Sequence, residues 1–300
     1  MLRYAVMLCC YNRKDKTLAC LESLLAQQLP VGVSLDILLL DDGSSDGTSV
    51  AVAKRFPQVK RYQGSGQMYW NGAMTHLWQQ ACKYDYDAYI WLNDDVQLHT
   101  DALARLHGWQ AKVSNRLGAM VGSMHEPGCT KVSYGGRRSL RAWHPLGFGS
   151  LLTPAPQPIQ CDFINGNLCF IPKAAVETVG ILDKTYTHAL GDFDYGLRLK
   201  QAGFYLYVAP GLYGQCASNS KLNSVFDASL PMTTRLALLN NPARFVPVDE
   251  WMHFVRRHGG LIWPLLWLKA LMRKVAPRIW LWRRGQTPAD LNANDGCSRK

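Results

Sequence analysis

The chain has 300 residues, of which 48% are hydrophobic, so it is long enough to bury a sizeable core and is not a disordered polymer. Its formal net charge of +11 at pH 7 indicates an anionic partner, which is a nucleic acid, a phosphorylated small molecule or an anionic membrane surface. The 9 cysteines are scattered without C-x-x-C or zinc-type spacing, which argues against a disulfide framework or a structural zinc site and favours a reduced, cytosolic protein.

The first predicted element is a strand at residues 3–10. Its apolar run ends at Tyr11 and no cleavage site follows, so it is too short for the core of a signal peptide. No later apolar stretch reaches the roughly 18 to 20 residues that span a bilayer. We therefore expect a cytoplasmic protein.

Strands and helices alternate through the first third of the chain. The helix after the first strand begins near Asp15, where leucines recur on one face. The later predicted elements are a strand at 36–43, a helix in 44–56, a strand at 59–62, a helix in 71–84 and a strand at 89–93. This alternation predicts an α/β fold with a largely parallel sheet.

Polar residues follow three of the predicted strands at the point where each strand ends. The segments are CCYNR at 9–13, DDGSSDGT at 41–48 and NDD at 93–95. Taken singly, each is also ordinary turn and helix-cap chemistry. Since the carboxyl ends of parallel strands meet at one edge of a sheet, where ligands bind, three such segments in succession predict a binding site.

Four segments in this order resemble glycosyltransferase family 2, whose members have the GT-A fold. They are MLCCYNRKDKTLACLESLLAQ at 7–27, ILLLDDGSSDGT at 37–48, YIWLNDDV at 89–96 and GDFDYGLRLKQAGF at 191–204. The resemblance extends over roughly residues 3–215 and implies a Rossmann-like mixed sheet flanked by helices. It also implies an inverting, nucleotide-sugar-dependent transferase similar to bacterial polysaccharide and rhamnosyl-type enzymes.

Asp94 and Asp95 stand where the resemblance implies the family's Asp-x-Asp metal motif, although the first position here is Asn93. The resemblance assigns Asp95 as the metal ligand and Asp94 to the donor sugar or ribose. Oxygen ligands suit Mg²⁺ or Mn²⁺, and such an ion stabilises a departing nucleotide. The structural alternative is a capped turn before a helix at 100–109.

The nucleotide site implied by the resemblance includes Cys9, Tyr11 and Asn12 of the first segment, with Tyr11 stacking on the base. Asp42 is matched to an acceptor for a base N–H, which favours uracil or thymine and hence a UDP- or dTDP-sugar. Asp41 can exchange roles with Asp42. The alternatives are a packing role for Tyr11 and helix capping for Asp42.

The glycine-rich segment 64–74 has neither P-loop nor dinucleotide-fingerprint spacing, which argues against hydrolase and dehydrogenase functions. By resemblance it lies beside the donor, where Asn71 contacts the nucleotide and Trp70 is either a site or a core residue. Asn165 and Gly166 resemble the family segment that lines the donor sugar.

Asp192 and Asp194 open a predicted helix in the motif GDFDYGLR. Inverting transfer needs a base that removes the acceptor hydroxyl proton. The match to the family motif assigns this role to Asp192, with Asp194 orienting the acceptor or the helix start and Arg198 as an ion-pair partner or a phosphate contact. In the alternative, both aspartates only cap the helix. The family often has a metal-binding His further on, but 208–220 contains none, and Cys216 is a weak substitute for a hard cation.

The chain changes character after residue 225. Six apolar residues form one helical stripe flanked by basic residues, namely Leu261, Leu265, Leu268, Met272, Val275 and Ile279. Such a stripe either lies in an anionic membrane interface or packs on the catalytic domain or a second subunit. Pro264 and Pro277 would break a single long helix there. The arginine-rich loop 134–145 is either a mobile acceptor loop or a solvated basic loop.

We therefore predict a GT-A glycosyltransferase domain at 1–225, a basic amphipathic helical segment at 226–284 and a disordered tail at 285–300. The expected reaction moves a sugar from a nucleotide-diphosphate donor to a glycan or lipid-linked acceptor in bacterial surface polysaccharide synthesis. The expected location is the cytoplasm, with peripheral contact to the inner face of the membrane. Homo-oligomers are allowed and nucleic acid is not an expected partner.

Two other functions compete with this hypothesis. A nucleotidyltransferase would also use paired aspartates and Mg²⁺, but LCCYNRKDKT is a poor version of its activating motif. A non-catalytic nucleic-acid-binding protein would account for the positive charge, but no basic aromatic sheet motif, helix-turn-helix or zinc module is present in the sequence.

Overall fold

The computed structural model describes residues 1–113, 116–140, 146–219 and 222–287. In these residues a ten-stranded mixed sheet has the order β10-β12-β6-β11-β4-β1-β2-β3, with β5 paired to β12 and β7 to β6. The strands are β1 Leu2–Cys10, β2 Val33–Asp41, β3 Lys60–Gln63, β4 Ala88–Leu92, β5 Gln97–Leu98, β6 Leu117–His125, β7 Val132–Tyr134, β10 Ile159–Gln160, β11 Leu168–Pro172 and β12 Tyr205–Gln215. The predicted α/β fold with a mixed sheet flanked by helices is confirmed.

The parallel half of the sheet brings three predicted polar segments to one edge. β1 pairs in parallel with both β2 and β4, and the register sets Cys10 opposite Asp41 and Met7 opposite Trp91. The three strands therefore end side by side, as the sequence predicted. Beyond β4 the sheet changes direction, because β11 runs antiparallel to it.

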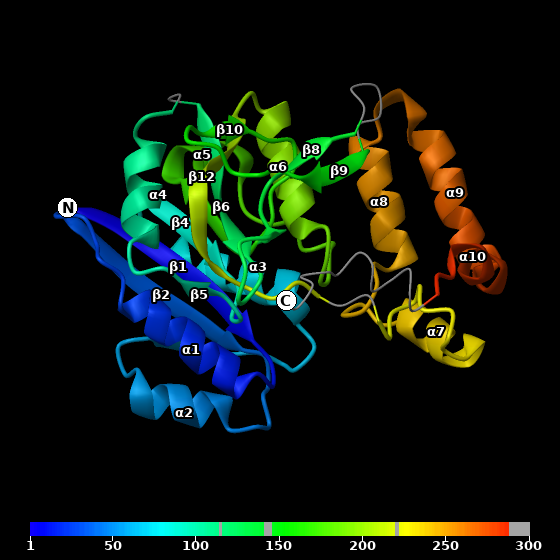
Figure 1. Cartoon of the computed structure of the whole chain (residues 1–300), viewed down its shortest axis with the longest axis horizontal. Helices are drawn as coiled ribbons and strands as arrows, with labels where there is room; N and C mark the ends of the chain where they lie inside the picture. Colours follow the sequence, from blue (N-terminus) through cyan, green and yellow to red (C-terminus); the bar gives the residue numbers. More distant parts are fainter. Residues whose placement is uncertain (114–115, 141–145, 220–221, 288–300) are drawn as a thin grey trace.

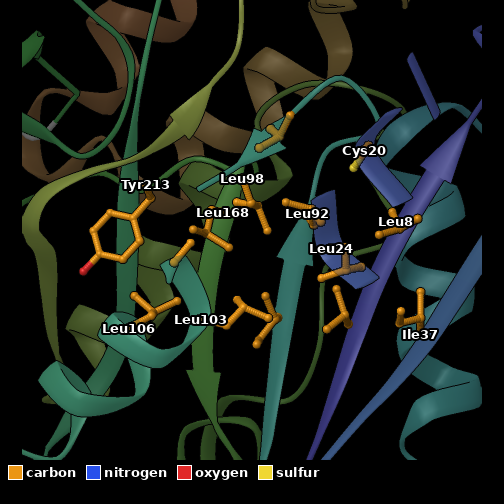
Figure 2. Close-up of a cluster of buried hydrophobic side chains, with 14 of the residues drawn as sticks. Leu8, Cys20, Leu24, Ile37, Leu92, Leu98, Leu103, Leu106, Leu168 and Tyr213 are labelled. Carbon is orange, nitrogen blue, oxygen red and sulfur yellow. The ribbon is translucent and has the colours of Figure 1, made fainter. Parts of the chain in front are cut away.

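Helices cover both faces of the sheet (Figure 1). The cores contain residues of α1 Lys14–Leu25, α2 Thr48–Arg55 and α4 Ala102–Gln110 on one face, and of α3 Tyr69–Ala81, α5 Lys173–Val179 and α6 Gly191–Gln201 on the other. Figure 2 shows the first of these cores, where Leu24 and Leu103 from helices meet Leu8 and Leu92 from strands. Each such buried leucine contributes roughly 1.5–3 kcal/mol to folding.

An aromatic cluster fixes α6 against the sheet. Trp91 of β4, Trp78 of α3 and Tyr195 of α6 contact one another with ring centroids 5.0–5.3 Å apart. All three side chains are fully buried. Because Asp192 lies one turn before Tyr195, this cluster determines where the predicted base is held relative to the end of β4.

Part of the predicted arginine-rich loop forms a β-strand. Arg137–Ser139 form β8, which pairs with β9 Phe148–Leu151 in a separate two-stranded sheet. Arg141, Trp143 and His144 of the same loop lie outside the described residues.

The C-terminal part is helical, as predicted, with α7 Met232–Leu239, α8 Val248–His258, the 3₁₀ turn Gly260–Ile262, α9 Trp263–Val275 and α10 Pro277–Arg284. Pro264 lies in the first turn of α9 and Pro277 is the first residue of α10, so both prolines begin helices. The predicted stripe is therefore divided between the 3₁₀ turn, which holds Leu261, and these two helices. Buried Arg235 of α7 donates to the carbonyl oxygens of Val225 and Leu281 and ties α7 to α10.

Part of the predicted tail is ordered, since the backbone at Gln286 bonds to Phe226 and Ala228. Residues 288–300 lie outside the described residues. Within the described part of the chain, no helix combines the length and the apolar character required to cross a membrane.

A buried carboxylate connects α6 to α8. Asp194 has no exposed surface, and its oxygens accept hydrogen bonds from His258 Nε2 at 2.8 Å, Arg257 Nη1 at 2.9 Å, Arg198 Nε at 2.8 Å and the Tyr186 hydroxyl at 3.2 Å. Burial alone raises the pKa of Asp194, but these donors outweigh it and hold the pKa well below its usual range. Asp194 thus holds two helices together, and Arg198 is its structural ion-pair partner.

Replacing this carboxylate should destabilise the fold. Asp194→Ala leaves buried His258 without its carboxylate partner and removes one ion pair each from Arg198 and Arg257, so the free energy of unfolding should fall by about 3–5 kcal/mol. Because the pKa is depressed, the stabilisation is present above about pH 4 and is lost as the pH falls through the folded-state value.

Urea unfolding of the full chain at neutral pH measures the effect. Lys173→Ala, which breaks an exposed pair with Asp85, is the control and should leave the midpoint unchanged. Equal midpoints for Asp194→Ala and the control would contradict a structural role for Asp194.

Candidate active site

Asn12 joins the first two polar segments at the sheet edge. Its backbone N–H donates to Ser44 Oγ at 2.9 Å and its side-chain oxygen accepts from the Ser45 N–H at 2.7 Å. Tyr11 is 53% exposed, so one face of its ring is available to a flat ligand. Cys9 is partly buried, and burial raises the pKa of its thiol well above the usual value, so the sulfur stays protonated.

The paired carboxylates at the end of β4 share one cationic side chain. Arg13 Nη1 lies 3.1 Å from Asp94 Oδ1 and 3.1 Å from Asp95 Oδ2. Asp94 is buried and also accepts from the Thr17 hydroxyl at 3.4 Å. Burial raises the pKa of Asp94 to about 6, against the opposing charge of Arg13. Two carboxylates so placed require a positive charge between them.

This donor set suits a divalent cation of the Mg²⁺ or Mn²⁺ type. The oxygen atoms of Asp94 and Asp95 converge on one cation, which Arg13 provides, and such metals take one or two carboxylates together with phosphate oxygens and water. Cys216 donates a hydrogen bond to Asp95 at 3.5 Å, and burial raises the pKa of its thiol, so it acts as a donor to Asp95 rather than as a thiolate ligand. Within the described residues, no group of three or more His, Cys, Asp or Glu side chains is arranged around a metal position.

Asp42 holds the glycine-rich loop. Its carboxylate accepts backbone N–H groups of Gly66 at 2.8 Å, Met68 at 2.8 Å and Tyr69 at 3.0 Å, at the start of α3. A Cβ at Gly64 would lie 2.4 Å from Asp42 Oδ1, so the loop approaches too closely for a side chain. The predicted contact of Asp42 with a base N–H stays a prediction, and the loop-holding role adds to it.

Asp41 offers the free acceptor of this pair. One of its carboxylate oxygens accepts the Ser44 N–H at 2.8 Å, while the other is buried and has no hydrogen-bond partner among the described residues. Both oxygens of Asp42 already accept N–H groups, so Asp41 has the unused acceptor of the pair. The sequence left the roles of Asp41 and Asp42 interchangeable.

Asn71 faces the protein interior. Its side-chain N–H groups donate to the carbonyl oxygens of Asp183 at 2.8 Å and Tyr186 at 2.7 Å, and its side chain is fully buried. A Cβ at Gly191 would lie 1.8 Å from Asn71 Oδ1, which explains the glycine at the start of α6. Asn71 therefore positions the segment before Asp192 and presents no surface to a nucleotide.

Trp70 contacts residues near both aspartate motifs. Its indole N–H donates to Asn93 Oδ1 at 2.9 Å, and a Cβ at Gly166 would lie 2.3 Å from its ring. Gly166 must therefore be glycine. Asn165 donates to Asn167 Oδ1 at 3.1 Å, while its own side-chain oxygen is buried and has no hydrogen-bond partner among the described residues. Trp70 thus contacts both Asn93, next to the Asp94–Asp95 pair, and Gly166.

Asp192 is a partly exposed residue whose carboxyl group is surrounded by protein atoms. Its Oδ1 accepts the Phe193 N–H at 2.8 Å. Surrounding protein atoms raise the pKa of Asp192 to about 6, although N–H groups of Phe193 and Gly166 and the charge of Arg137 oppose the shift. Such a carboxylate is ionised at pH 7 and is a stronger base than an ordinary aspartate.

Three residues at the site had no individual role assigned from the sequence, although Arg137 belongs to the arginine-rich loop expected to be an acceptor loop or a solvated loop. They are Arg13, which bridges Asp94 and Asp95; Arg137, whose charge acts on Asp192; and His188, whose Nδ1 accepts the Trp70 N–H at 3.4 Å. Burial and then the charge of Arg13 lower the pKa of His188, so it is neutral at pH 7. Arg13 belongs to the quoted CCYNR segment, but no spacing rule marks His188 or Arg137.

Of the four non-glycine residues with positive φ in the described part of the chain, Asn223 lies in the C-terminal part and the other three lie near the site. Asn12, Tyr69 and Leu190 have φ values of 49°, 53° and 72°, in the left-handed region that non-glycine residues seldom adopt. Each costs of order 1–3 kcal/mol unless its side chain tolerates the conformation, as asparagine does. The three residues lie beside Arg13, Trp70 and Asp192, which is where strain is expected if the surrounding fold imposes the geometry.

A family model described as glycosyl transferase family 2 matches residues 5–161, slightly more than half of the chain. No curated protein sequence matches the chain. The matched range contains both polar segments at the ends of β1 and β2 and the Asp94–Asp95 pair.

Solved glycosyltransferases have a similar fold. The mannosyltransferase PcManGT from Pyrobaculum calidifontis, solved with GDP-Man and Mn²⁺, aligns with 99% of this chain and 76% of its own at a TM-score of 0.54 and 14% identity. Residues 1–349 of S. aureus TarS align with 93% of this chain and 82% of that one at a TM-score of 0.51 and 15% identity. GalNAc-T7, solved with UDP, GalNAc and Mn²⁺, gives a TM-score of 0.59 at 15% identity over 93% of this chain and 58% of its own.

The bridging guanidinium predicts how the site responds to a metal ion. Arg13→Ala removes the positive charge between Asp94 and Asp95, so Mn²⁺ alone should bind at least about fivefold more tightly than to the unsubstituted chain. Asp95→Ala should abolish this binding. Electron paramagnetic resonance of free Mn²⁺ measures it without any substrate.

Arg55→Ala, which breaks the exposed pair of α2 with Glu22, is the matched control and should leave Mn²⁺ affinity unchanged. Weaker Mn²⁺ binding by Arg13→Ala than by this control would contradict the competition between Arg13 and the metal.

Proposed function

We propose that this chain, which belongs to glycosyl transferase family 2, transfers a sugar with inversion from a nucleotide-diphosphate donor to a hydroxyl group of a glycan or a lipid-linked acceptor. Family membership makes it a nucleotide-sugar glycosyltransferase. The proposal adds inversion, a UDP- or dTDP-sugar donor and the acceptor class. The observation that carries it is a series of contacts between the two aspartate motifs. Arg13 pairs with Asp94 and Asp95, Trp70 bonds to the adjacent Asn93 and lies against Gly166, and the Gly166 N–H acts on Asp192.

The donor end of this surface is proposed to be the edge formed by β1, β2 and β4. Tyr11 stacks on the base, Asn12 and Cys9 form the floor beside it, and Asp41 or Asp42 accepts a base N–H. The exposed ring of Tyr11 and the unpaired oxygen of Asp41 support this arrangement. PcManGT was solved with GDP-Man and GalNAc-T7 with UDP, so the base has to be determined by experiment.

The metal position is proposed at Asp95, with Asp94 directed to the ribose or the sugar. A bound Mg²⁺ or Mn²⁺ would supply stabilisation of the negative charge on the departing diphosphate. Arg13 supports this, since it already balances charge at that point and can pair with a phosphate once it leaves Asp95. Asn165 and Gly166 would line the sugar.

Asp192 is proposed as the general base. Its carboxylate takes the proton of the acceptor hydroxyl while the hydroxyl oxygen bonds to the anomeric carbon. The bond from that carbon to the phosphate oxygen breaks on the opposite face, and its electron pair leaves with the nucleotide diphosphate. The raised pKa of Asp192, about 6, supports this role, because the group is ionised at neutral pH yet readily accepts a proton.

The cellular setting is also a proposal. It comprises synthesis of a bacterial surface polysaccharide in the cytoplasm, at the inner face of the membrane. We propose that residues 1–225 form the catalytic unit and 226–284 an appended helical unit. The nucleotidyltransferase and nucleic-acid-binding hypotheses are set aside, because family membership assigns glycosyl transfer to the chain.

Removal of the base should separate catalysis from donor binding. Asp192→Asn keeps the shape of the side chain but cannot take a proton, so turnover should fall by about 10²–10⁴-fold while donor affinity is unchanged. In the unsubstituted enzyme, kcat/KM should decline as the pH falls through about 6, because protonation of Asp192 removes the base.

Release of nucleotide from a UDP-sugar panel, with water or a simple glycoside as acceptor, measures turnover. Proton NMR of the first product reports whether the anomeric configuration is inverted. Asp85→Asn, an exposed surface change, is the control. Retention of configuration, or an Asp192→Asn enzyme with more than a tenth of normal turnover, would refute this assignment.

A further inference from the structure

The apolar stripe predicted from the sequence faces solvent. Its members Leu261, Leu265, Leu268, Met272, Val275 and Ile279 are between 45% and 101% exposed. Trp282 continues the stripe along α10 and is 75% exposed. The structure therefore rules out the alternative in which these side chains pack on the catalytic domain.

The opposite face of α9 is already used. Leu266 and Trp267 pack against the core formed by Phe254 and Val255 of α8, and Ala270 is buried. At about 100° per residue, Ala270 lies roughly opposite Leu265, Leu268 and Met272 on the helix. α8 lies between α9 and the catalytic domain (Figure 1), so the stripe points away from that domain. A helix that is apolar on both faces needs a second apolar partner.

Positive charge surrounds the stripe. Residues 261–284 contain six Lys or Arg side chains and no Asp or Glu. Arg273 is buried and donates to the Val246 carbonyl, and Lys274 pairs with Asp249. The remaining four, all exposed, are Lys269, Arg278, Arg283 and Arg284. An exposed apolar stripe, an exposed Trp and basic flanks are the combination that seats helices in anionic lipid headgroups.

We propose that α9 and α10 form a docking surface for an anionic lipid bilayer, with the stripe inserted at the level of the headgroups and the basic side chains on the lipid phosphates. α9 has 13 residues and is about 20 Å long, so it lies along the interface and does not span it. A second copy of the chain fits less well, because a symmetric contact would bring the same basic residues against each other.

The surface is rigidly connected to the catalytic helix. Arg257 and His258 at the end of α8 bind Asp194, which lies two residues after Asp192 on α6. Docking through α9 would therefore hold the active site at a fixed height above the bilayer. Membrane binding itself does not depend on the proposed function. Only the expected benefit, access to a lipid-linked acceptor, rests on the proposed function.

Co-sedimentation of the full chain with vesicles tests the proposal. One vesicle set is phosphatidylcholine and the other contains about one third phosphatidylglycerol. We expect binding at least about tenfold tighter to the anionic set and a decline with added salt. The triple variant Leu265→Gln, Leu268→Gln, Met272→Gln and the double variant Lys269→Glu, Arg278→Glu should each weaken it by about tenfold or more.

The control variant Val31→Gln, Val50→Gln changes two apolar side chains that are equally exposed on the catalytic domain, and it should bind vesicles like the unsubstituted chain. Hydrolysis of the donor in solution by the triple variant should remain normal, which separates a failure of docking from a failure of the proposed function. Vesicle binding that is equal for both lipid sets or unaffected by the stripe variant would overturn the proposal. So would a dimer, seen by light scattering and lost in the triple variant, without vesicle binding.

Discussion

The contact on which the rest of the structure depends is the buried carboxylate of Asp194. It takes hydrogen bonds from α6 itself, through Arg198, and from Arg257 and His258 of α8. A carboxylate without solvent is stable only when donors surround it, so the position of α8 is dictated by a residue of α6. That constraint fixes the C-terminal helices on the catalytic domain and holds α6 in place, with Asp192 two residues away on the same helix.

A second electrostatic balance lies at the end of β4. Asp94 and Asp95 follow this strand with two adjacent negative charges, and Arg13, which follows β1, pairs with both. A metal-bound diphosphate would bring both a cation for the carboxylates and an anion for Arg13. The same three side chains thus suit a metal-bound diphosphate through a change of partners.

The sequence predicted those features that depend on local pattern. Asp94, Asp95 and Tyr11 follow buried strands directly, so alternation of elements was enough to bring them to one edge, and the motif around Asp192 opens a helix as expected. The apolar stripe could also be recognised from its helical periodicity in the sequence, and its side chains are exposed in the structure.

The roles that sequence could not predict depend on distant partners. Asn71 is held by carbonyl groups more than 110 positions away, and Asp194 by side chains 63 and 64 positions away. No residue near Asn71 or Asp194 in the sequence indicates these partners. Because asparagine and aspartate are common in binding sites, the sequence favoured a ligand-binding role for both. His188 was missed for the same reason, since its contact with Trp70 is created by the fold.

The most direct test of the account is thermal unfolding of the chain with UDP, dTDP, GDP or CDP, each with Mn²⁺, with Mg²⁺ and with a chelator. A ligand that binds only the native state raises the melting temperature by mass action, without knowledge of the acceptor. The account predicts a metal-dependent increase with UDP or dTDP that Asp95→Ala abolishes. No increase with any nucleotide, or an increase that persists in chelator and in Asp95→Ala, would contradict it.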